Sequence, residues 1–557
     1  RAAAWAAVCA ASGAAGQYAA VNDGYAYPAN AVPAPAPAFA AQPGFAGAEQ
    51  VVTDAYGGYG GDPAYGDASA AYVYPTTTTP VPAPPPLFVI PGAPTPDAAL
   101  TESTKQSLPT APWMPVQAEG CGQRFQLPGA APEHATDYNG AELPPVCFTS
   151  GSPSKDGKHH VWIIGDWGGV TEHPWNQTYQ APIPADHRNA KQFKAHHRPF
   201  IFGADDSAQT NVAQQMRNRV SKTEADYILN VGDNFYWGGI NVHCGAPPGM
   251  TKDITRQWEK GFESVYTGPG VDGKQWLGVL GNHDYGGWMF VSGWDQMIGY
   301  SWLQGFPSTN RWVTPAQYWS NKVHYEDFSI DYFFLDTNVF DTWEEHADAA
   351  HNICSVLHSP QNGATCGEVG PVSPDECPQW FQRLWAAEKL WLEAGLAAAT
   401  GDWQIIVTHF PPEGLWGSNE WKSLSAQYGI DLFVTGHRHC QEVHYMDEHN
   451  PMLPTAYVVS GGGGGITAEN TPAADGQDDE YGFMDFTMTK GEIMIEAISH
   501  GGQIRSTTCV HKRHPGGDSE HYGWAGPSLC DGVMPGPQPL PWSPPAAGGF
   551  MPPAGGG

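Results

Sequence analysis

Short runs of apolar, β-forming residues recur through the middle of the chain, and several end in Gly followed by a polar residue. Residues 161–166 read VWIIGD, residues 227–233 read YILNVGD and residues 432–437 read LFVTGH. Apolar runs of about four to eight residues bounded by Gly are typical of buried strands. Each polar residue then lies at the carboxyl end of a strand, where the sites of open α/β sheets collect.

Helical patterns alternate with these strands. The stretch NVAQQMRNRVSK places Val212, Met216 and Val220 on one helical face, and residues 379–399 predict a long helix without internal proline. Further strands are predicted within residues 329–338, 402–410 and 456–460, with a hairpin over residues 485–498 that turns at Lys490 and Gly491. The predicted fold class is therefore an α/β layered domain.

The ends of the chain differ from this pattern. Many of the 67 Gly and 51 Pro residues lie there, in stretches such as AVPAPAPAFAAQP that lack a periodic apolar face. Burial cannot offset the chain entropy of such segments, so they are expected to be extended. The predicted organisation is a low-complexity segment over 1–118, a lead-in with Cys121 and Cys147 over 119–157, a catalytic domain over 158–510 with a Cys-containing insertion over 341–380, and a Pro/Gly-rich tail over 511–557.

Charge and hydropathy exclude several classes of partner. The net charge of −31 disfavours nucleic acid and anionic membrane surfaces, which both require a basic footprint. The sequence contains no run of about 18 apolar residues, so no membrane-spanning helix is expected.

The cysteines indicate an oxidising compartment. There are ten, none in a C-x-x-C pair, which fits a few disulfides better than a zinc finger or thioredoxin site. Asn176 begins an Asn-Gln-Thr glycosylation signal, and the opening AAAWAAVCAASGAAG is compatible with the remains of a signal peptide. The expected location is secreted, extracellular or lumenal in the secretory pathway.

Five strand ends carry possible metal ligands. Taken singly, a Gly-Asp after a strand is often a turn, and a lone His is more often a hydrogen-bonded polar residue than a ligand. Together, the carboxylates, imidazoles and neutral amide match the mixture that two neighbouring cations require. The candidates are Asp166, Asp233 with Tyr236, Asn282 with His283, His409, and His437 with His439.

The ordered blocks GDWGG, GDNFYWGG, GNHDY, THFP and GHRH resemble the signature of metallophosphoesterases. The tyrosine in the second block is similar to that of the purple acid phosphatases, and the chain resembles most the small, tartrate-resistant type. The resemblance covers roughly residues 158 to 505. It implies the metallophosphoesterase fold, a layered β-sandwich flanked by helices, and a binuclear metal centre.

The resemblance also implies roles for individual residues. Asp233 would bridge two metals, and His283 would be the catalytic residue that orients the phosphate and helps protonate the leaving group. The Fe(III) ligands would be Asp166, Tyr236 and His439. The ligands of a second divalent metal (Fe, Zn or Mn) would be Asn282, His409 and His437.

The implied activity is hydrolysis of phosphomonoesters by attack of a metal-bound hydroxide. The substrate would be a phosphorylated small molecule or a phosphoprotein. One departure is that the stretch PPEGLWGSNEWKS, which follows THF, lacks the second substrate-side histidine of the mammalian type. This shifts the proton-donor role mainly to His283.

Two other functions remain open. The domain could serve as a structural or scaffold component of an extracellular or surface assembly, with protein partners bound through the N-terminal segment. It could also act as a phosphodiesterase or nucleotidase, because the blocks do not fix the substrate. Cys440, directly after His439, is expected to be buried or disulfide-bonded.

Overall fold

The computed structural model describes residues 121–169, 171–172, 179–180, 199–236, 238–240, 242–245, 257–287, 289–342, 352–356, 364–413, 418–447, 450–513 and 528–533. The predicted extended segment over 1–118, the glycosylation signal at Asn176 and most of the tail lie outside these residues. Among the helices that are described, none combines the length and apolar character needed to span a bilayer.

One seven-stranded sheet, here called sheet A, forms half of the fold. Its central strands β9, β10, β11 and β13 run parallel, whereas β12 pairs antiparallel with β13 and β8 pairs antiparallel with β9. In spatial order the strands are β1 (Ala141–Cys147), β8 (Trp319–His324), β9 (Ser329–Phe334), β10 (Trp403–Val407), β11 (Leu432–Thr435), β13 (Ala456–Ser460) and β12 (Gln441–His444).

The second seven-stranded sheet, sheet B, is parallel at one end and antiparallel at the other. Strands β2, β5, β6 and β7 run parallel, and β14 joins β2 antiparallel. Its spatial order is β16 (Ile504–His511), β15 (Glu492–Ser499), β14 (Gly482–Met488), β2 (His159–Ile164), β5 (Tyr227–Asn230), β6 (Trp276–Gly278) and β7 (Trp312–Val313). A separate two-stranded sheet pairs β3 (Thr171–Glu172) with β4 (Tyr179–Gln180).

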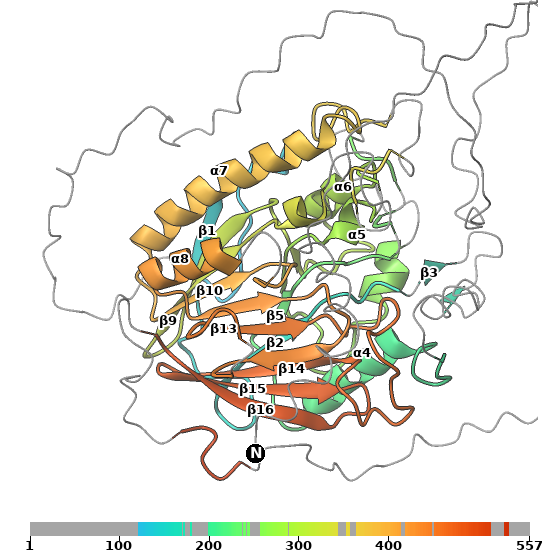
Figure 1. Ribbon diagram of the computed structural model, residues 1–557. Coiled ribbons are helices and arrows are strands. Elements are labelled where there is room, and N and C mark those ends of the chain that lie inside the picture. Colours follow the sequence, from blue (N-terminus) through green and yellow to red (C-terminus); the bar gives the residue numbers. More distant parts are fainter. Residues whose placement is uncertain are drawn as a thin grey trace, which may run out of the picture. The chain divides into compact units, whose positions relative to one another are not determined.

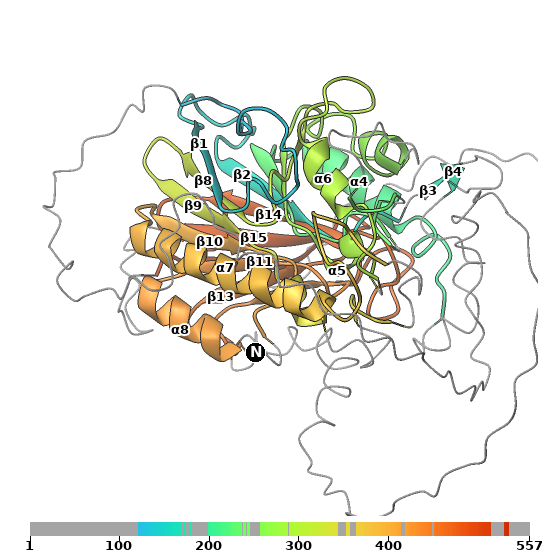
Figure 2. The same ribbon diagram turned by 90° about the horizontal axis from the view of Figure 1, so that it is seen from above.

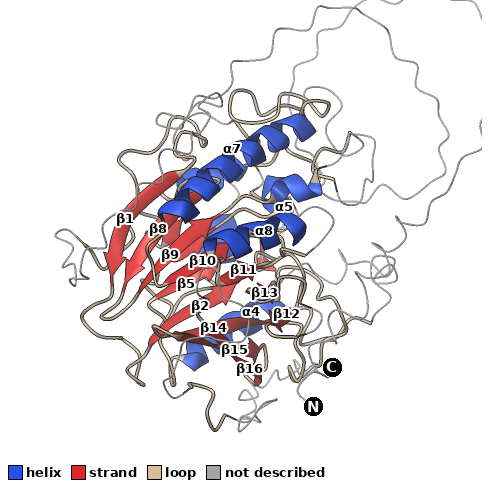
Figure 3. Ribbon diagram, turned by 60° about the vertical axis from the view of Figure 1, so that its left-hand side comes forward, coloured by secondary structure: helices blue, strands red, loops and turns tan. Residues whose placement is uncertain are grey.

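The two sheets pack face to face as a sandwich, which the alternation of side chains along each strand explains. In β10, Ile405 and Val407 belong to the core between the sheets, whereas Ile406 faces the opposite side and packs with the helices. In β2, Val161 and Ile163 face the same inter-sheet core. Successive side chains of a strand point to opposite faces, so each sheet is buried on both sides. Figure 3 shows the two groups of strands with helices outside them.

Helices cover the outer faces. In Figure 1 and Figure 2, α7 (Cys377–Ala398) and α8 (Ser418–Tyr428) lie side by side over sheet A, and α4 (Ala208–Arg219) lies against β14 and β15 of sheet B. Leu392 and Leu396 of α7 pack in the core that α7 and α8 form with sheet A. Shorter elements are α5 (Asn282–Tyr285), α6 (Trp294–Tyr300), a π-helix over Trp258–Glu263 and a 3-10 helix over Asn338–Asp341. The α/β layered sandwich predicted from the sequence is confirmed.

The predicted strands and the hairpin at Lys490 and Gly491 are also present, the latter as the β14–β15 pair. Four disulfides lie among the described residues, and Cys440 is buried, with its Sγ 3.1 Å from Oε1 of Glu442. Two of the disulfides hold the predicted insertion, and the other two hold the lead-in and the segment after β16. They join Cys121 to Cys147, Cys244 to Cys366, Cys354 to Cys377 and Cys509 to Cys530.

A buried charge network ties α4 to sheet B. The carboxylate of Asp485 in β14 accepts hydrogen bonds from His160 Nδ1 at 2.8 Å, Arg219 Nε at 2.8 Å and Thr223 Oγ1 at 2.6 Å. Burial by itself would raise the pKa of Asp485, but His160 and Arg219 outweigh it and lower this pKa. Burial would lower the pKa of His160, but Asp485 and Asp156 outweigh it and raise this pKa.

These opposite shifts predict a window of maximum stability. The contribution of Asp485 is complete above its unfolded pKa of about 4 and is lost as pH falls through its lower folded pKa. The contribution of His160 is complete below its unfolded pKa of about 6.5 and is lost as pH rises through its higher folded pKa. Both are therefore complete between about pH 4 and pH 6.5.

We predict that Asp485→Asn lowers the free energy of unfolding by about 3 kcal/mol at pH 5.5, because it leaves Arg219 with only part of its buried charge compensation. The part of the pH dependence above pH 6.5 that His160 causes should also weaken. Denaturant unfolding at pH 5.5 and pH 8 measures both effects. Glu224→Gln, which removes a partly exposed pair with Lys274, should cost less than about 1 kcal/mol. Equal effects of the two variants would contradict the buried-network account.

Candidate metal centre

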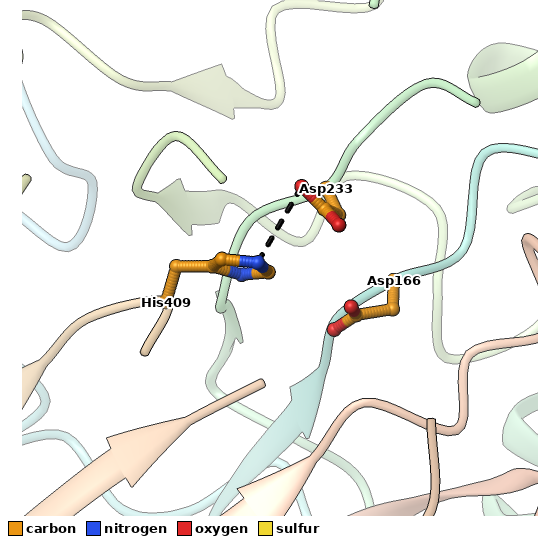
Figure 4. A group of neighbouring side chains, drawn as sticks. All are labelled: Asp166, Asp233 and His409. Atoms are coloured by element: carbon orange, nitrogen blue, oxygen red, sulfur yellow. Dashed lines mark ion pairs between the residues drawn. The ribbon is translucent and has the colours of Figure 1, made fainter. Parts of the chain in front are cut away.

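The carboxyl ends of the central strands of both sheets meet at one edge of the sandwich. Asp166 follows β2 and Asp233 follows β5 in sheet B, while His409 follows β10 in sheet A. The backbone joins the sheets here, because Gly165 N donates to Ser460 O at the end of β13 at 2.8 Å. Figure 4 shows the three side chains pointing toward one another from loops that follow different strands.

Three of the predicted ligands have an unusual backbone conformation. The φ angles of Asp166, Asp233 and His437 are 57°, 50° and 69°, in the left-handed region that residues with a Cβ rarely adopt. Such conformations cost free energy and persist where the surrounding structure holds them in place, often at functional sites. The three loops therefore turn sharply at the residues whose side chains face the site.

Glycines let the loops pack closely behind these side chains. Gly232 has a φ of 93°, and a Cβ added there would lie 2.9 Å from Nδ1 of His409. A Cβ added at Gly465, in the glycine run after β13, would lie 2.3 Å from Cδ2 of Tyr236. The glycines thus keep both side chains in their positions.

The hydroxyl of Tyr236 lies between two buried carboxylates. Its Oη is 3.0 Å from Oδ1 of Asp166 and 2.8 Å from Oδ2 of Asp233, and 3.2 Å from Nε2 of His439. Tyr236, Asp166 and Asp233 are almost fully buried, whereas His439 is half-buried. A phenol has one proton and can donate it to one acceptor at a time. At most one of the two carboxylate oxygens therefore receives this proton, and a cation bound among these oxygens would offset their repulsion.

Two histidines are oriented by the same kind of hydrogen bond, from Nδ1 to a backbone oxygen. Nδ1 of His409 lies 2.8 Å from the backbone oxygen of Val231, and Nδ1 of His439 lies 2.9 Å from that of Thr467. A carbonyl only accepts, so each Nδ1 carries a proton and each Nε2 is left to face the carboxylates. Nε2 of His409 is 3.5 Å from Oδ1 of Asp233, and Nε2 of His439 is 3.6 Å from Oδ1 of Asp166.

Asn282 and His437 adjoin the same place. The amide oxygen Oδ1 of Asn282 lies 3.1 Å from Nε2 of His409. The ring of His437 is 5.2 Å from the ring of His409, and its backbone N donates to Oδ2 of Asp166 at 3.1 Å. The structure therefore brings all seven predicted ligands to one edge of the sandwich.

The pKa values reflect the crowding of charge. Burial, together with the charge of Asp233, raises the pKa of Asp166 well above its ordinary range. Burial would raise the pKa of Asp233 as well, but His409 and His283 outweigh it and lower this pKa. Burial by itself would lower the pKa of His409, but the carboxylates of Asp233 and Asp166 outweigh it and raise this pKa to about 10. Protons thus gather where a cation would offset the same negative charge, and binding of a cation would release them.

The donor set fits a metal centre. Asp166, Asp233 and His409 each offer one ligand atom, and these atoms lie within 4.8 Å of one another in a buried setting. Carboxylate oxygens combined with imidazole nitrogens suit iron, zinc and manganese. The phenol of Tyr236 and the amide of Asn282 add two more oxygen donors to this set.

His283 takes a different position from the ligand candidates. Its backbone N donates to Oδ1 of Asp233 at 2.9 Å, and its half-buried ring lies 4.6 Å from the ring of Tyr236. The next residue, Asp284, is fully buried and accepts from Gly281 N at 2.8 Å and from Asn234 Nδ2 at 2.7 Å. Sequence reasoning does not identify Asp284, which joins the GNHD loop to the GDNF loop.

Asp341 is a second residue that the sequence does not reveal. Its Oδ2 accepts a hydrogen bond from Nδ2 of Asn282 at 3.1 Å, across a separation of 59 residues. A carboxylate that accepts fixes the amide with its nitrogen toward Asp341 and its oxygen toward His409. Asp341 lies in the 3-10 helix after β9, in a stretch without a motif.

Comparison with known proteins places the chain in a family. The model of the calcineurin-like phosphoesterase family matches residues 159–441, which is just over half of the chain. The chain therefore belongs to the calcineurin-like phosphoesterase family.

Among curated proteins, the chain is 25% identical over 264 residues to purple acid phosphatase 17 of Arabidopsis thaliana, covering 46% of this chain and 63% of that protein. It is 24% identical over 314 residues to tartrate-resistant acid phosphatase type 5 of Mus musculus, covering 54% and 71%. The chain thus spans less than two thirds of the first relative. The resemblance to this group that the motifs indicate is confirmed.

Solved structures with a similar arrangement include the purple acid phosphatase PPD1 from yellow lupin (Lupinus luteus) seeds, at 14% identity, with 66% of this chain and 56% of that chain covered and a TM-score of 0.37. GAP50, the anchor in the inner membrane complex of Plasmodium, is 15% identical, with 64% and 90% covered and a TM-score of 0.39.

We predict that Asp341→Ala weakens binding of one metal ion by about 10- to 100-fold, because the amide of Asn282 loses the acceptor that orients it. Asp341→Asn should retain most of the affinity, since its amide oxygen can still accept. Metal content after dialysis against graded chelator concentrations measures the effect. Unchanged affinity of Asp341→Ala for every bound ion would contradict the orienting role.

Proposed function

We propose that the chain is a binuclear-metal acid phosphatase that hydrolyses phosphomonoesters. One observation carries this proposal: the carboxylate of Asp233 faces two different groups of donors. Its Oδ2 lies 2.8 Å from Oη of Tyr236, while its Oδ1 lies 3.5 Å from Nε2 of His409. A carboxylate with one oxygen toward each group supports the proposal that Asp233 bridges two ions.

The proposed ligand groups follow from this division. Asp166, Tyr236 and His439 would hold Fe(III), because burial and the two nearby carboxylates raise the pKa of Tyr236 well above its ordinary value. A strongly charged cation is required to keep such a phenol ionised. On the other side, Asn282, His409 and His437 would hold a divalent ion of Fe, Zn or Mn with one neutral amide and two imidazoles.

When bound, the two ions would polarise the phosphate and supply hydroxide at mildly acidic pH. The residues of the chain then have separate tasks. Asp233 holds the backbone N of His283 and so keeps the imidazole at the site. His283 would orient the phosphate and donate a proton to the oxygen of the leaving alcohol. The imidazole is half-buried, which leaves part of it accessible to a substrate.

The proposed location is an oxidising compartment, either extracellular or within the secretory pathway. The four disulfides favour such a compartment, because the cytosol keeps thiols reduced. Asn176 is the proposed glycosylation site. A change in mass on enzymatic removal of N-glycans, abolished by Asn176→Gln, would test that assignment.

The function is tested by measuring metal content and hydrolysis on the purified chain. Two metal ions per chain, one of them iron, and hydrolysis of phosphomonoesters at mildly acidic pH are expected. A metal-free protein without activity would overturn the proposal. Metal binding without hydrolysis would favour the scaffold function, and a preference for diesters or nucleotides over simple monoesters would favour the phosphodiesterase or nucleotidase function.

We predict that Tyr236→Phe abolishes the visible absorption that a tyrosinate–Fe(III) pair produces, while the chain remains folded. The matched control is Tyr332→Phe, which removes a buried hydroxyl bonded to Tyr227 at 2.9 Å in the core between the sheets. The visible spectrum and the iron content of both variants are measured. If colour persists in Tyr236→Phe, the ligand assignment of this residue is wrong.

A further inference from the structure

The residue between the two histidines of the GHRH block points away from the proposed metal centre. Nε2 of His439 faces Asp166 and Tyr236, and the ring of His437 faces His409. The guanidinium of Arg438 instead binds two glutamates, and its side chain is only 20% exposed. One short loop therefore carries two proposed ligands on one side and a partly buried arginine on the other.

One partner of Arg438 is Glu442 in β12. Nη2 of Arg438 lies 2.5 Å from Oε2 and Nε lies 3.1 Å from Oε1, so the guanidinium fork binds both oxygens. Nε2 of His444 and Sγ of Cys440 also bond to this carboxylate, at 2.7 Å and 3.1 Å. Burial would raise the pKa of Glu442, but Arg438 outweighs it and the pKa falls to about 2. This pair anchors the arginine within its own segment of the chain.

The other partner of Arg438 belongs to a different loop. Its Nη1 forms an ion pair with Oε1 of Glu413, and Oε2 of Glu413 accepts a hydrogen bond from the hydroxyl of Tyr457 at 2.5 Å. Glu413 lies four residues after His409, in the loop that follows β10. Arg438 thus connects the loop that carries His409 with the loop that carries His437 and His439.

Only arginine can make this connection in full. Its planar group offers five donors, so it can bind Glu442 with two of them and still reach Glu413 with a third. A lysine ammonium is a point charge and cannot reproduce the fork. The backbone adds one further bond between the loops, from Gly436 N to His409 O at 2.9 Å. This bond would remain if the side-chain link were removed, so loss of the link should leave the fold intact.

We propose that Arg438 and Glu413 form a clamp that positions His409 relative to His437 and His439, and thereby sets the affinity of the site for its metal ions. The inference rests on the metal centre proposed above. Arg438 pairs with Glu413 and Glu442, and none of the three is among the proposed ligands, so Arg438 and Glu413 are positioning residues. Such partners behind a ligand commonly change metal affinity by about 10- to 100-fold.

The test compares Glu413→Ala with Glu420→Ala. Glu420 on α8 is a matched control, because it is also a partly exposed glutamate in an ion pair, with Lys389 at 2.8 Å. Glu413→Ala should release metal to a chelator at concentrations about tenfold lower or more, with a changed visible spectrum and a melting temperature of the metal-free chain close to that of the parent. Glu420→Ala should match the parent in all of these measurements.

Two further variants separate charge from hydrogen bonding. Glu413→Gln keeps an acceptor without the charge and should fall between the parent and Glu413→Ala. Arg438→Lys can pair with one glutamate and not with both, so it should weaken metal binding as Glu413→Ala does. Retention of the parental affinity by Glu413→Ala or by Arg438→Lys would overturn the clamp.

A measurement without metal keeps the clamp distinct from the proposed function. Hydrogen exchange of the backbone amides over residues 436–440 in the metal-free chain should be faster in Glu413→Ala than in the parent and in Glu420→Ala. If the parent binds no metal while this exchange difference is present, the proposed phosphatase fails and the clamp on the loop is supported. Equal exchange in the parent and in Glu413→Ala would overturn the clamp, whatever the parent binds.

Discussion

Two buried carboxylates, Asp166 and Asp233, face the same small volume at the ends of neighbouring parallel strands. Their mutual repulsion in a setting removed from water is the constraint on which the rest of the site depends. The shifted pKa values of Asp166, Asp233 and His409 show the same charge being offset by protons. The hydroxyl of Tyr236 and Nε2 of His409 also face this volume, and each is a group that can bind a cation.

This arrangement requires unfavourable backbone conformations and glycines at close contacts between loops. Three of the ligand candidates, Asp166, Asp233 and His437, adopt left-handed φ angles, and loops approach within distances that only glycine allows. These features destabilise the chain locally, and the two cores on either side of each sheet hold them in place. At the site, the three left-handed residues each lie shortly after the end of a strand, where the direction of the turn decides whether the side chain faces the site.

The central strands can be predicted from the sequence because they depend on local signals, and so can the position of the candidate ligands at the ends of these strands. A buried parallel strand is a continuous apolar run, and the Gly with its polar neighbour marks where the run ends. Strand β1 is not predicted from the sequence, because Pro144 and Pro145 argue against a strand. It forms because it lies at the edge of its sheet, where proline is tolerated. Strand β16 is polar and half-exposed along most of its length, so its sequence lacks an apolar run.

The residues behind the ligands could not be predicted, because they act across long separations in sequence. Asp341, in the 3-10 helix after β9, meets Asn282 across a separation of 59 residues, and Arg438 meets Glu413 through the packing of two loops. Neither contact has a local pattern. The proposed roles of the ligands themselves stay predictions drawn from the motifs, whereas their proximity is a property of the fold.

The origin of the ligand candidates in two different sheets has a mechanical consequence. Asp166, Asp233 and Asn282 follow strands of sheet B, and His409 and His437 follow strands of sheet A. An ion held by both sets would be a cross-link between the two halves of the sandwich. A substitution that tilts one sheet against the other, even far from this edge, would then change the affinity of the site for the ion.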